Sequence, residues 1–345
     1  MPQKILLAMS GGVDSSAAAI LLLETGAMLS GLTLCLHPWE SDAGLEDARH
    51  VAQQLGFPHE FFSLKEQFQS QVIDRFISEY RAGKTPNPCI DCNREIKFGA
   101  LLELARRRGF DALATGHYAR VARDGASGRW LLKKAVDEQK DQSYVLYQLT
   151  QEQLAQVRFP LGGLSKAQAR ALAEQHGLLN AHRPDSQDIC FIPDGDYAAF
   201  IQRATGEPPA SGRFIDSVGN TLGTHRGLIH YTVGQRKGLG IALGRPVYVL
   251  AKNARDNTVT LGENSALFSR EMTVDHINLI SVASLSEPMR VQVKARYRHA
   301  AQPATIYPEG NCIRVVFDQP QRAITPGQAA VFYDGEVVVG GGTIL

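Results

Sequence analysis

Short apolar segments alternate with amphipathic segments over the first part of the chain, from Lys4 to about Ile192. The apolar segments cover residues 5–9, 29–36 and 112–115, and segments with helical spacing cover residues 15–23, 45–55, 66–80 and 93–107. Such alternation is typical of a parallel sheet with helices on both faces. The pattern therefore predicts a doubly wound α/β domain, with a Pro- and Cys-containing loop over residues 85–91.

The pattern changes near residue 205. Gly-Glu-Pro-Pro at 206–209 and a Gly-rich run to Gly244 interrupt every long helical period. From about Met272 onward, short strands of alternating polarity, such as residues 291–297, are separated by turn residues, which favours a small barrel or sandwich. We therefore predict three domains, at residues 1–204, 205–271 and 272–345, of which the last is all-β.

Length and composition agree with a globular protein of several domains, because 345 residues exceed the size at which one hydrophobic core stops growing. No run approaches the roughly 18 apolar residues of a membrane span. The N-terminus enters a strand-like segment directly, without a signal peptide. We expect a cytoplasmic protein with no membrane partner. A net charge of +1 does not indicate nucleic-acid binding, so that function has to rest on local groups.

A glycine- and serine-rich loop, residues 10–16 (Ser-Gly-Gly-Val-Asp-Ser-Ser), lies between the first apolar strand and the first helix. Glycines let backbone N–H groups approach an anion, and the helix N-terminus adds partial positive charge. The spacing fits neither a Walker A loop nor a dinucleotide fingerprint. A plain Gly-rich turn with a serine cap is the alternative. We predict a phosphate-binding loop, in which Asp14 helps to hold Mg²⁺.

Five cysteines, an odd number without an export signal, predict reduced thiols. Cys35 and Cys312 lie in apolar, strand-like runs and are predicted core residues. Cys89 and Cys92 form a CxxC pair, but the chain has no second pair to complete a zinc site. Cys92 lies beside a predicted helix start near Arg94 and Lys97, which would favour its thiolate. Cys190 lies far away in sequence on a strand-like segment.

Two sets of motifs carry a resemblance to known families. The loop at residues 10–16 resembles the pyrophosphate loop of ATP pyrophosphatases, which adenylate a carbonyl oxygen and include several synthetases. Six further motifs occur in the order found in the tRNA-specific 2-thiouridylase family: residues 85–98, 114–120, 140–144, 185–191, 231–240 and 325–333. The resemblance extends over nearly the whole chain.

The resemblance implies a three-domain enzyme, a tRNA-uridine 2-sulfurtransferase with an adenine nucleotide alpha-hydrolase-like N-terminal domain, a central tRNA-binding domain and a C-terminal β-barrel. It implies Cys92 as nucleophile and Cys190 as persulfide carrier. The implied ATP-binding residues are Ala8, Met9, Ser10, Gly11, Gly12, Val13, Asp14, Ser15, Leu34 and Gly116. The implied tRNA-binding residues are Asn87, Pro88, Cys89, His117, Lys140, Asp141, Gln142, Arg296, Tyr297 and Gln328.

One position departs from the family, because many members have Asp where this chain has Cys89. Whether Asp91 takes over that role is left open. A second route is also open, since Cys89, Cys92 and Cys190 are ligands of the type that hold an iron–sulfur cluster.

The expected chemistry begins with adenylation of the C2 oxygen of the wobble uridine, which turns that oxygen into a good leaving group. Cys190 would receive sulfur as a persulfide from a donor protein, either a cysteine desulfurase or a sulfur-relay protein. Either the persulfide attacks C2, or Cys92 frees hydrosulfide from it. Both routes end with AMP and a Cys92–Cys190 disulfide. The rival functions are a small-molecule synthetase and a nucleotide-binding regulator.

Cations are clustered in two places, of which one is predicted to bind tRNA. Lys294, Arg296 and Arg298 alternate along one predicted strand and would share a face, which favours phosphate contacts. The substitution of Arg296 is then expected to weaken tRNA binding and to flatten its salt dependence. Residues 106–108, three arginines at the end of a helix, are more simply a solvated surface.

Overall fold

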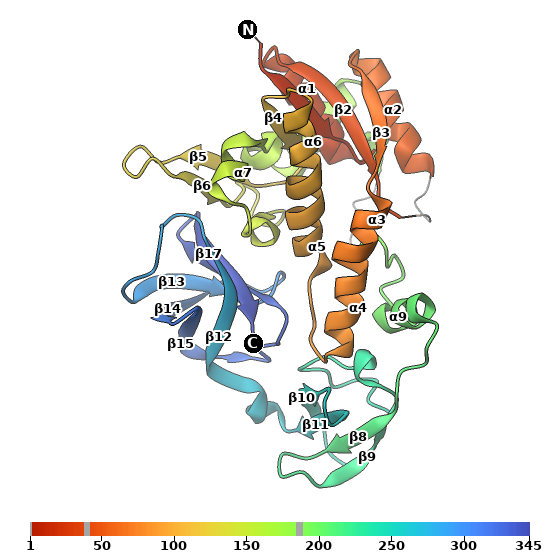
Figure 1. Ribbon diagram of the computed structural model, residues 1–345, viewed down its shortest axis with the longest axis vertical. Coiled ribbons are helices and arrows are strands. Elements are labelled where there is room, and N and C mark those ends of the chain that lie inside the picture. The colour runs from red at the N-terminus through yellow and green to blue at the C-terminus, as the bar shows by residue number, and fades with distance from the viewer. Residues whose placement is uncertain (1, 38–41, 184–188) are drawn as a thin grey trace.

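A five-stranded parallel sheet forms the centre of the N-terminal domain, and its strand order is β3-β2-β1-β4-β7. The computed structural model describes residues 2–37, 42–183 and 189–345, with this domain at the top of Figure 1. The strands are β1 (Lys4–Ala8), β2 (Met28–Cys35), β3 (His59–Ser63), β4 (Ala112–Thr115) and β7 (Val157–Arg158). The predicted strands at 5–9, 29–36 and 112–115 are confirmed.

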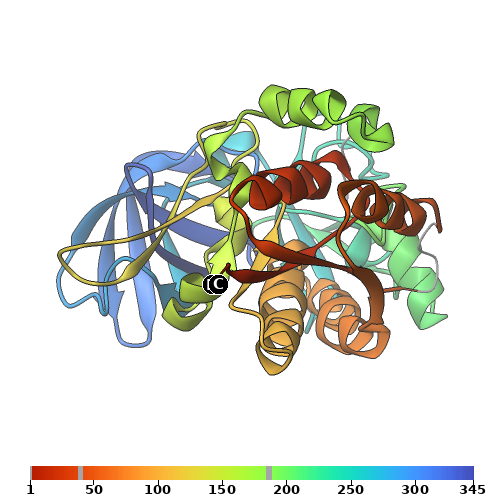
Figure 2. The same cartoon turned by 90° about the horizontal axis from the view of Figure 1, so that it is seen from above.

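Helices cover both faces of this sheet, as Figure 2 shows from above. Alternate side chains of β1 point to opposite faces, so Ile5 and Leu7 belong to one apolar cluster and Leu6 to another. The helices of the first face are α1 (Val13–Glu24), α2 (Asp42–Leu55) and α8 (Lys166–Gln175). The second face and its lower extension carry α3 (Lys65–Phe68), η1 (Gln69–Ile73), α4 (Asp74–Arg81), α5 (Pro88–Asp91), η2 (Cys92–Leu101), α6 (Leu102–Arg107) and α7 (Gln151–Gln156).

The two long predicted helices are continuous but contain π-helical turns, η1 and η2. The predicted loop at 85–91 is shorter than expected, because Pro88 already begins α5. Proline is favourable at a first helical position, where its missing N–H costs nothing. Cys92 therefore lies inside the helix rather than at its start.

The central domain lies at the bottom of Figure 1 and is reached through α9 (Tyr197–Thr205). Its sheet has the order β10-β11-β8-β9 and encloses a small core around Phe214 and Tyr231. The strands are β8 (Gly212–Ile215), β9 (Thr221–His225), β10 (Tyr248–Asn253) and β11 (Thr258–Gly262).

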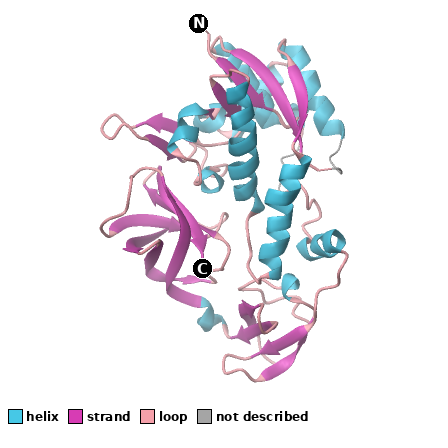
Figure 3. Ribbon diagram, in the orientation of Figure 1, coloured by secondary structure: helices cyan, strands magenta, loops and turns pink. Residues whose placement is uncertain are grey.

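The C-terminal domain is a closed barrel of six strands, drawn in magenta in Figure 3, in which β12 pairs with both β15 and β17. The strands are β12 (Phe268–Leu279), β13 (Met289–Lys294), β14 (Gln302–Glu309), β15 (Cys312–Arg322), β16 (Ala329–Asp334) and β17 (Val337–Ile344). The prediction of an all-β barrel is confirmed. The predicted strand at 291–297 is wrong at its end, because β13 stops at Lys294.

A hairpin of the N-terminal domain, β5 (Arg120–Arg123) and β6 (Trp130–Lys133), extends the barrel sheet by pairing Lys133 with Val337. Arg120 and Lys133 both bind the carboxylate of Glu336, at 2.6 and 2.8 Å. These two contacts, that of Lys133 first, lower the pKa of Glu336 to about 2. The N-terminal domain and the barrel are thus joined by strand pairing as well as by ion pairs.

The apolar cluster behind the hairpin contains residues of both domains. Leu132, Tyr144 and Tyr147 come from the N-terminal domain, and Val331 and Tyr333 come from the barrel. Within the described residues, no helix is long and apolar enough to cross a membrane.

Candidate active site

The loop after β1 is a tight turn that ends in the N-terminus of α1. Gly11 has φ +71°, and a Cβ there would lie 2.1 Å from the carbonyl oxygen of Gly44. Gly12 is the N-cap residue of α1, and the hydroxyls of Ser15 and Ser16 donate to its carbonyl oxygen at 3.0 and 3.1 Å. The first N–H groups of a helix have no acceptors within the helix, so they face outward from this turn. The geometry fits an anion-binding loop.

Asn180, in η5 (Leu179–His182), supports the loop from behind. Its Nδ2 donates to the carbonyl oxygen of Gly11 at 2.9 Å and to the hydroxyl of Ser16 at 2.8 Å, and the residue is buried. No local sequence pattern indicates this contact, because Asn180 is 169 residues away from Gly11.

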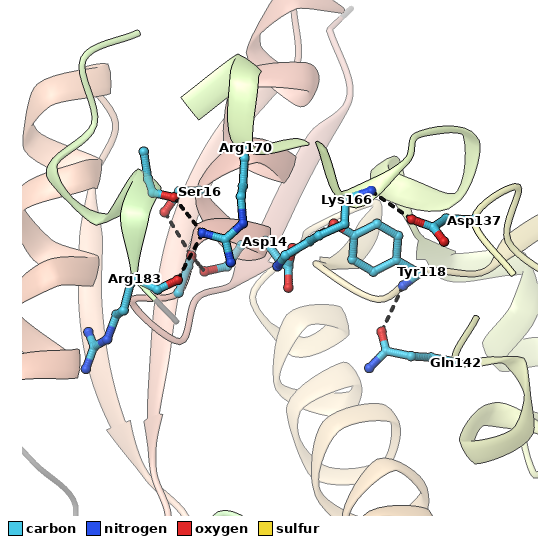
Figure 4. Close-up of polar contacts among 11 residues, drawn as sticks. Asp14, Ser16, Tyr118, Asp137, Gln142, Lys166, Arg170 and Arg183 are labelled. Atoms are coloured by element: carbon cyan, nitrogen blue, oxygen red, sulfur yellow. Dashed lines mark hydrogen bonds and ion pairs between the residues drawn. The ribbon is translucent and has the colours of Figure 1, made fainter. Parts of the chain in front are cut away.

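Asp14 belongs to the loop and lies beside two groups from other elements, Lys166 and Tyr118, as Figure 4 shows. The ammonium of Lys166 and the hydroxyl of Tyr118 both lie 2.7 Å from Asp14 Oδ1. The side chain of Lys166 is 11% exposed and that of Asp14 is 36% exposed, so the carboxylate faces solvent while the lysine lies beneath it. The ammonium of Lys166 is therefore a largely buried cation next to the loop.

Neither Lys166 nor Tyr118 was predicted from the sequence as a site residue. The only signal near Lys166 is the capping box of Ser165 and Gln168, which marks it as the first residue of α8. Gly116 lies against the loop, since a Cβ there would lie 2.9 Å from the backbone nitrogen of Ser15.

Residues Ala8 and Leu34 lie on β1 and β2, and the backbone N–H of Met9 donates to the carbonyl oxygen of Leu32 at 2.9 Å.

Asp14 can offer a carboxylate oxygen to Mg²⁺, which prefers such ligands. Within the described ranges, no three His, Cys, Asp or Glu residues are grouped to hold a metal ion. The three thiols Cys89, Cys92 and Cys190 therefore do not form a cluster site in this structure.

The elements α5, η2 and α6 form one continuous helix over residues 88–107, which we name the cysteine helix. It begins at a defined cap. The Asn87 side chain accepts a hydrogen bond from the backbone N–H of Cys89 at 3.1 Å, and Pro88 follows the cap. Cys89 is exposed and Cys92 is buried. Burial nevertheless raises the pKa of both thiols.

The prediction of a thiolate at Cys92 is wrong for this structure. Burial raises the pKa of Cys92 to about 11, and the opposing effect of Lys97 is smaller. The helix dipole acts mainly within the first turn, whereas Cys92 follows the four residues of α5.

Asp91 is buried, and Oδ1 of its carboxylate lies 3.2 Å from Arg94 and 3.5 Å from Arg75. Burial raises the pKa of Asp91, while the two arginines oppose that shift. Asp91 thus links α4, which carries Arg75, to the helix that carries Arg94 and Cys92.

Cys190 is exposed and lies in a turn, so the predicted strand at this position is wrong. The following residues, Phe191 and Ile192, are buried in the same apolar cluster as Cys92. Phe191 packs edge-on against Phe68 and Phe76, with ring centroids 5.7 and 5.6 Å apart. Residues 185–188 of this motif lie outside the described residues. The cluster brings the two segments together, although 98 positions separate the cysteines.

The predicted tRNA-binding residues fall into an exposed and a buried group. Tyr297 is 37% exposed, its ring lies 5.6 Å from that of Tyr144, and the Lys294 ammonium lies 5.5 Å from its ring centroid. Two further members of the exposed group lie at the start of the cysteine helix, namely Cys89, which is exposed, and Asn87, which is half-buried. Lys140 is half-buried as well.

His117 and Asp141 are buried and make internal contacts. His117 Nδ1 lies 2.7 Å from the hydroxyl of Thr115, and burial lowers its pKa well below the usual value. Asp141 accepts from the backbone of Ala135 at 3.0 Å and from the hydroxyl of Ser143 at 2.8 Å. Their burial does not support the predicted contact with tRNA.

Several other predicted residues also make internal contacts. The Gln142 side chain accepts from the backbone of Tyr118 at 2.9 Å. Arg296 and Arg298 lie in the turn after β13, so the predicted shared strand face is wrong. Cys35 and Cys312 are half-buried at strand ends rather than in the core.

The fold and the loop define the class of this protein, a nucleotide-binding α/β domain followed by two β domains. Three family descriptions match it: tRNA methyl transferase HUP domain over residues 3–194, tRNA methyl transferase PRC-barrel domain over residues 198–263, and aminomethyltransferase beta-barrel domain over residues 269–344.

Curated relatives cover almost the whole chain. The tRNA-specific 2-thiouridylase MnmA of Acetivibrio thermocellus is 50% identical, over 99% of both chains. That of Clostridioides difficile is 46% identical over 100% of this chain and 98% of its own, and that of Trichormus variabilis is 45% identical over 99% and 98%. The chain belongs to the tRNA-specific 2-thiouridylase family.

Proposed function

We propose that this protein is a tRNA-uridine 2-sulfurtransferase that uses ATP and a cysteine persulfide to make 2-thiouridine at the wobble position. The family and the fold support this function. The observation that carries the cysteine chemistry is that Cys92 and the residues directly after Cys190 pack into one apolar cluster. A thiol pair that acts on one carbon has to be gathered in this way.

ATP binds with its phosphates at the N-terminus of α1. The glycines allow the close approach of the loop backbone, Lys166 neutralises phosphate charge from below, and the outer oxygen of Asp14 is a ligand for Mg²⁺. When bound, Mg²⁺ would balance the charge of the departing pyrophosphate. The proposed ATP-binding residues are Ala8 to Ser15, Leu34 and Gly116.

Adenylation of the C2 oxygen of uridine releases pyrophosphate and makes AMP the leaving group at C2. The terminal sulfur of a Cys190 persulfide then attacks C2 and expels AMP, and Cys92 attacks the Cys190 sulfur to leave a thiocarbonyl. In the alternative route, Cys92 attacks first and the freed hydrosulfide attacks C2. Both routes form one Cys92–Cys190 disulfide, which is reduced by two electrons from two external thiol groups, and these become a disulfide in turn.

Burial raises the pKa of Cys92 to about 11, and in this proposal the thiol is activated when tRNA binds. The attack needs the thiolate, and the burial that raises its pKa is the quantity that has to change. Asn87, Pro88 and Cys89 lead into the cysteine helix and would face the target base. Cys190 is exposed and can receive sulfur from a donor protein, a cysteine desulfurase or a relay protein.

The test combines the protein with ATP, Mg²⁺, a persulfide donor and unmodified tRNA, and measures 2-thiouridine by mass spectrometry. Cys92→Ser and Cys190→Ser should abolish the product, whereas Cys89→Ser should keep it. Loss in all three variants together with bound iron would favour the cluster route. Full activity on a small molecule in the Cys92 and Cys190 variants would favour a synthetase instead. The absence of tRNA-dependent AMP release from the wild type would exclude the enzyme function.

A further inference from the structure

The segment just before the cysteine helix is held by the barrel. The backbone N–H of Thr85 donates to the carbonyl oxygen of Pro326 at 3.0 Å, and the Gln328 side-chain amide donates to the carbonyl oxygen of Thr85. Both backbone groups of Thr85 are therefore bound by one loop of the C-terminal domain, residues 325–328, which we name the barrel loop. Such pairing fixes the position of Thr85 in two directions.

The approach of the two segments depends on a glycine. Gly327 has φ +88°, and a Cβ there would lie 2.9 Å from the backbone nitrogen of Thr85 and 2.8 Å from the Cβ of Lys84. Any side chain at this position would push the barrel loop away from the cysteine segment.

The barrel loop is itself rigidly supported. Its Gly327 N–H donates to the carbonyl oxygen of Ile344 at 2.9 Å. The Ile344 N–H donates to the backbone carbonyl oxygen of Gln328 at 2.8 Å. From the other side, Nη2 of Arg296 donates to the carbonyl oxygen of Ala323 and to the hydroxyl of Thr325, which is buried. Nη2 of Arg296 thus contacts the base of the barrel loop.

The central domain contacts the same segment. Lys252 in β10 donates to the carbonyl oxygen of Lys84 at 3.4 Å, and its ammonium lies 5.8 Å from the ring of Tyr80. Arg296 also reaches the central domain, where it donates to the carbonyl oxygen of Val233 at 3.3 Å. Both downstream domains therefore converge on residues 84–85.

Only one residue separates Thr85 from the cap of the cysteine helix. Asn87 holds the N–H of Cys89, and Cys92 follows one turn later. Pro86 and Pro88 flank the cap and restrict the backbone on both sides. A displacement of Thr85 would therefore be passed to Cys92 rather than absorbed.

We propose that Gln328 and Arg296 are positioning residues: through the barrel loop and Thr85, the C-terminal domain sets the placement of the cysteine helix. The role of Cys92 in this inference rests on the proposed function. This assignment replaces the direct phosphate contact expected from the sequence for Arg296. When tRNA binds to the downstream domains, a displacement of the barrel loop would in this way be passed through Thr85 to the buried thiol of Cys92.

The first test measures thiolation and tRNA binding in the full-length protein with Gln328→Met, which keeps the size of the side chain but removes its donor. Gln328→Glu offers no donor to the Thr85 carbonyl either and should behave alike. Gln319→Ala, an exposed glutamine on β15, is the matched control. We expect kcat to fall about five- to tenfold, as for one lost hydrogen bond, with an unchanged Kd for tRNA.

Arg296→Met separates the two roles of the arginine. A positioning role predicts a lower kcat with an unchanged dependence of tRNA affinity on salt. A phosphate contact predicts weaker binding, a flatter salt dependence and an unchanged kcat at saturating tRNA. That second result would overturn the inference for Arg296.

A measurement without substrates tests the positioning directly. Alkylation of Cys92, followed by peptide mass spectrometry in the absence of tRNA and ATP, should become about five- to tenfold faster in Gln328→Met, because the helix opens more often. Unchanged alkylation at equal melting temperature would overturn the inference. If alkylation accelerates although the wild type makes no 2-thiouridine, the positioning holds and the proposed function fails.

Discussion

The thiol of Cys92 illustrates how burial outweighs neighbouring charge. Lys97 favours the thiolate, but removal from water disfavours the charged form more strongly and raises the pKa to about 11. The thiolate of Cys92 is thus disfavoured in this structure.

A pH profile follows from this shift. A thiol reacts as its thiolate, and with a pKa of about 11 only about one molecule in a thousand is ionised at pH 8. Alkylation of Cys92 in the substrate-free protein should therefore rise about tenfold per pH unit from pH 7 to pH 10. A plateau below pH 9 would show that the thiol is already ionised, contrary to this expectation.

The buried cation at Lys166 is a second property of a single residue. We expect Lys166→Met to lower kcat/KM for ATP about a hundredfold, because a charge aimed at the phosphates is lost. Release of AMP in the presence of tRNA measures the effect. Lys4→Met is the control, since Lys4 is exposed and lies at the opposite end of β1. Equal losses in both variants would remove Lys166 from the phosphate site.

The loop and the cysteines could be predicted from the sequence because their chemistry lies in short segments. The partners of the loop could not, because Lys166 and Asn180 are 152 and 164 residues from Asp14 and Ser16. The ionisation state of Cys92 was also out of reach, since it depends on burial by Phe191 and other distant residues. Short sequence patterns indicate secondary-structure propensity, whereas the burial of a side chain depends on the whole folded chain.

Among the elements, the π-helix η2, like η1, has a geometry that helix propensity does not describe. It begins at Cys92, and a Cβ on Gly99 would lie 2.8 Å from the carbonyl oxygen of Arg94, five residues earlier. Insertions of this kind are frequent at functional sites. Here the wide turn sets the direction of the cysteine helix.

Gly99→Ala is expected to lower the free energy of unfolding by about 1–3 kcal/mol, because a backbone oxygen has to move. Helix propensity alone predicts the opposite sign, a gain of about 1 kcal/mol. Urea denaturation distinguishes the two. Gly163→Ala is the control, because a Cβ there meets nothing within 4 Å. A stabilised Gly99→Ala variant would show that the π-turn is not maintained by this contact.

At the scale of the whole molecule, three domains in sequence are not three independent units. The chain pattern predicted the strands of the barrel and the break near residue 205, but not the hairpin β5–β6 that joins the barrel sheet. Pairing between strands 200 residues apart leaves no periodic signal in either strand. The boundaries at 204 and 271 stay predictions.

Calorimetry should therefore show that the N-terminal domain and the barrel unfold in a single transition, because they share one apolar cluster. The central domain has its own core around Phe214 and is expected to melt separately. Separate melting of the isolated fragment 272–345 at the temperature seen in the intact chain would contradict this expectation.

The hairpin also determines how this protein can be recombined with its relatives. A chimera that exchanges only the last strands would leave Leu132 and Tyr144 facing foreign side chains. The transferable module is the barrel together with residues 118–149, so crossover points chosen from sequence boundaries alone should yield insoluble hybrids.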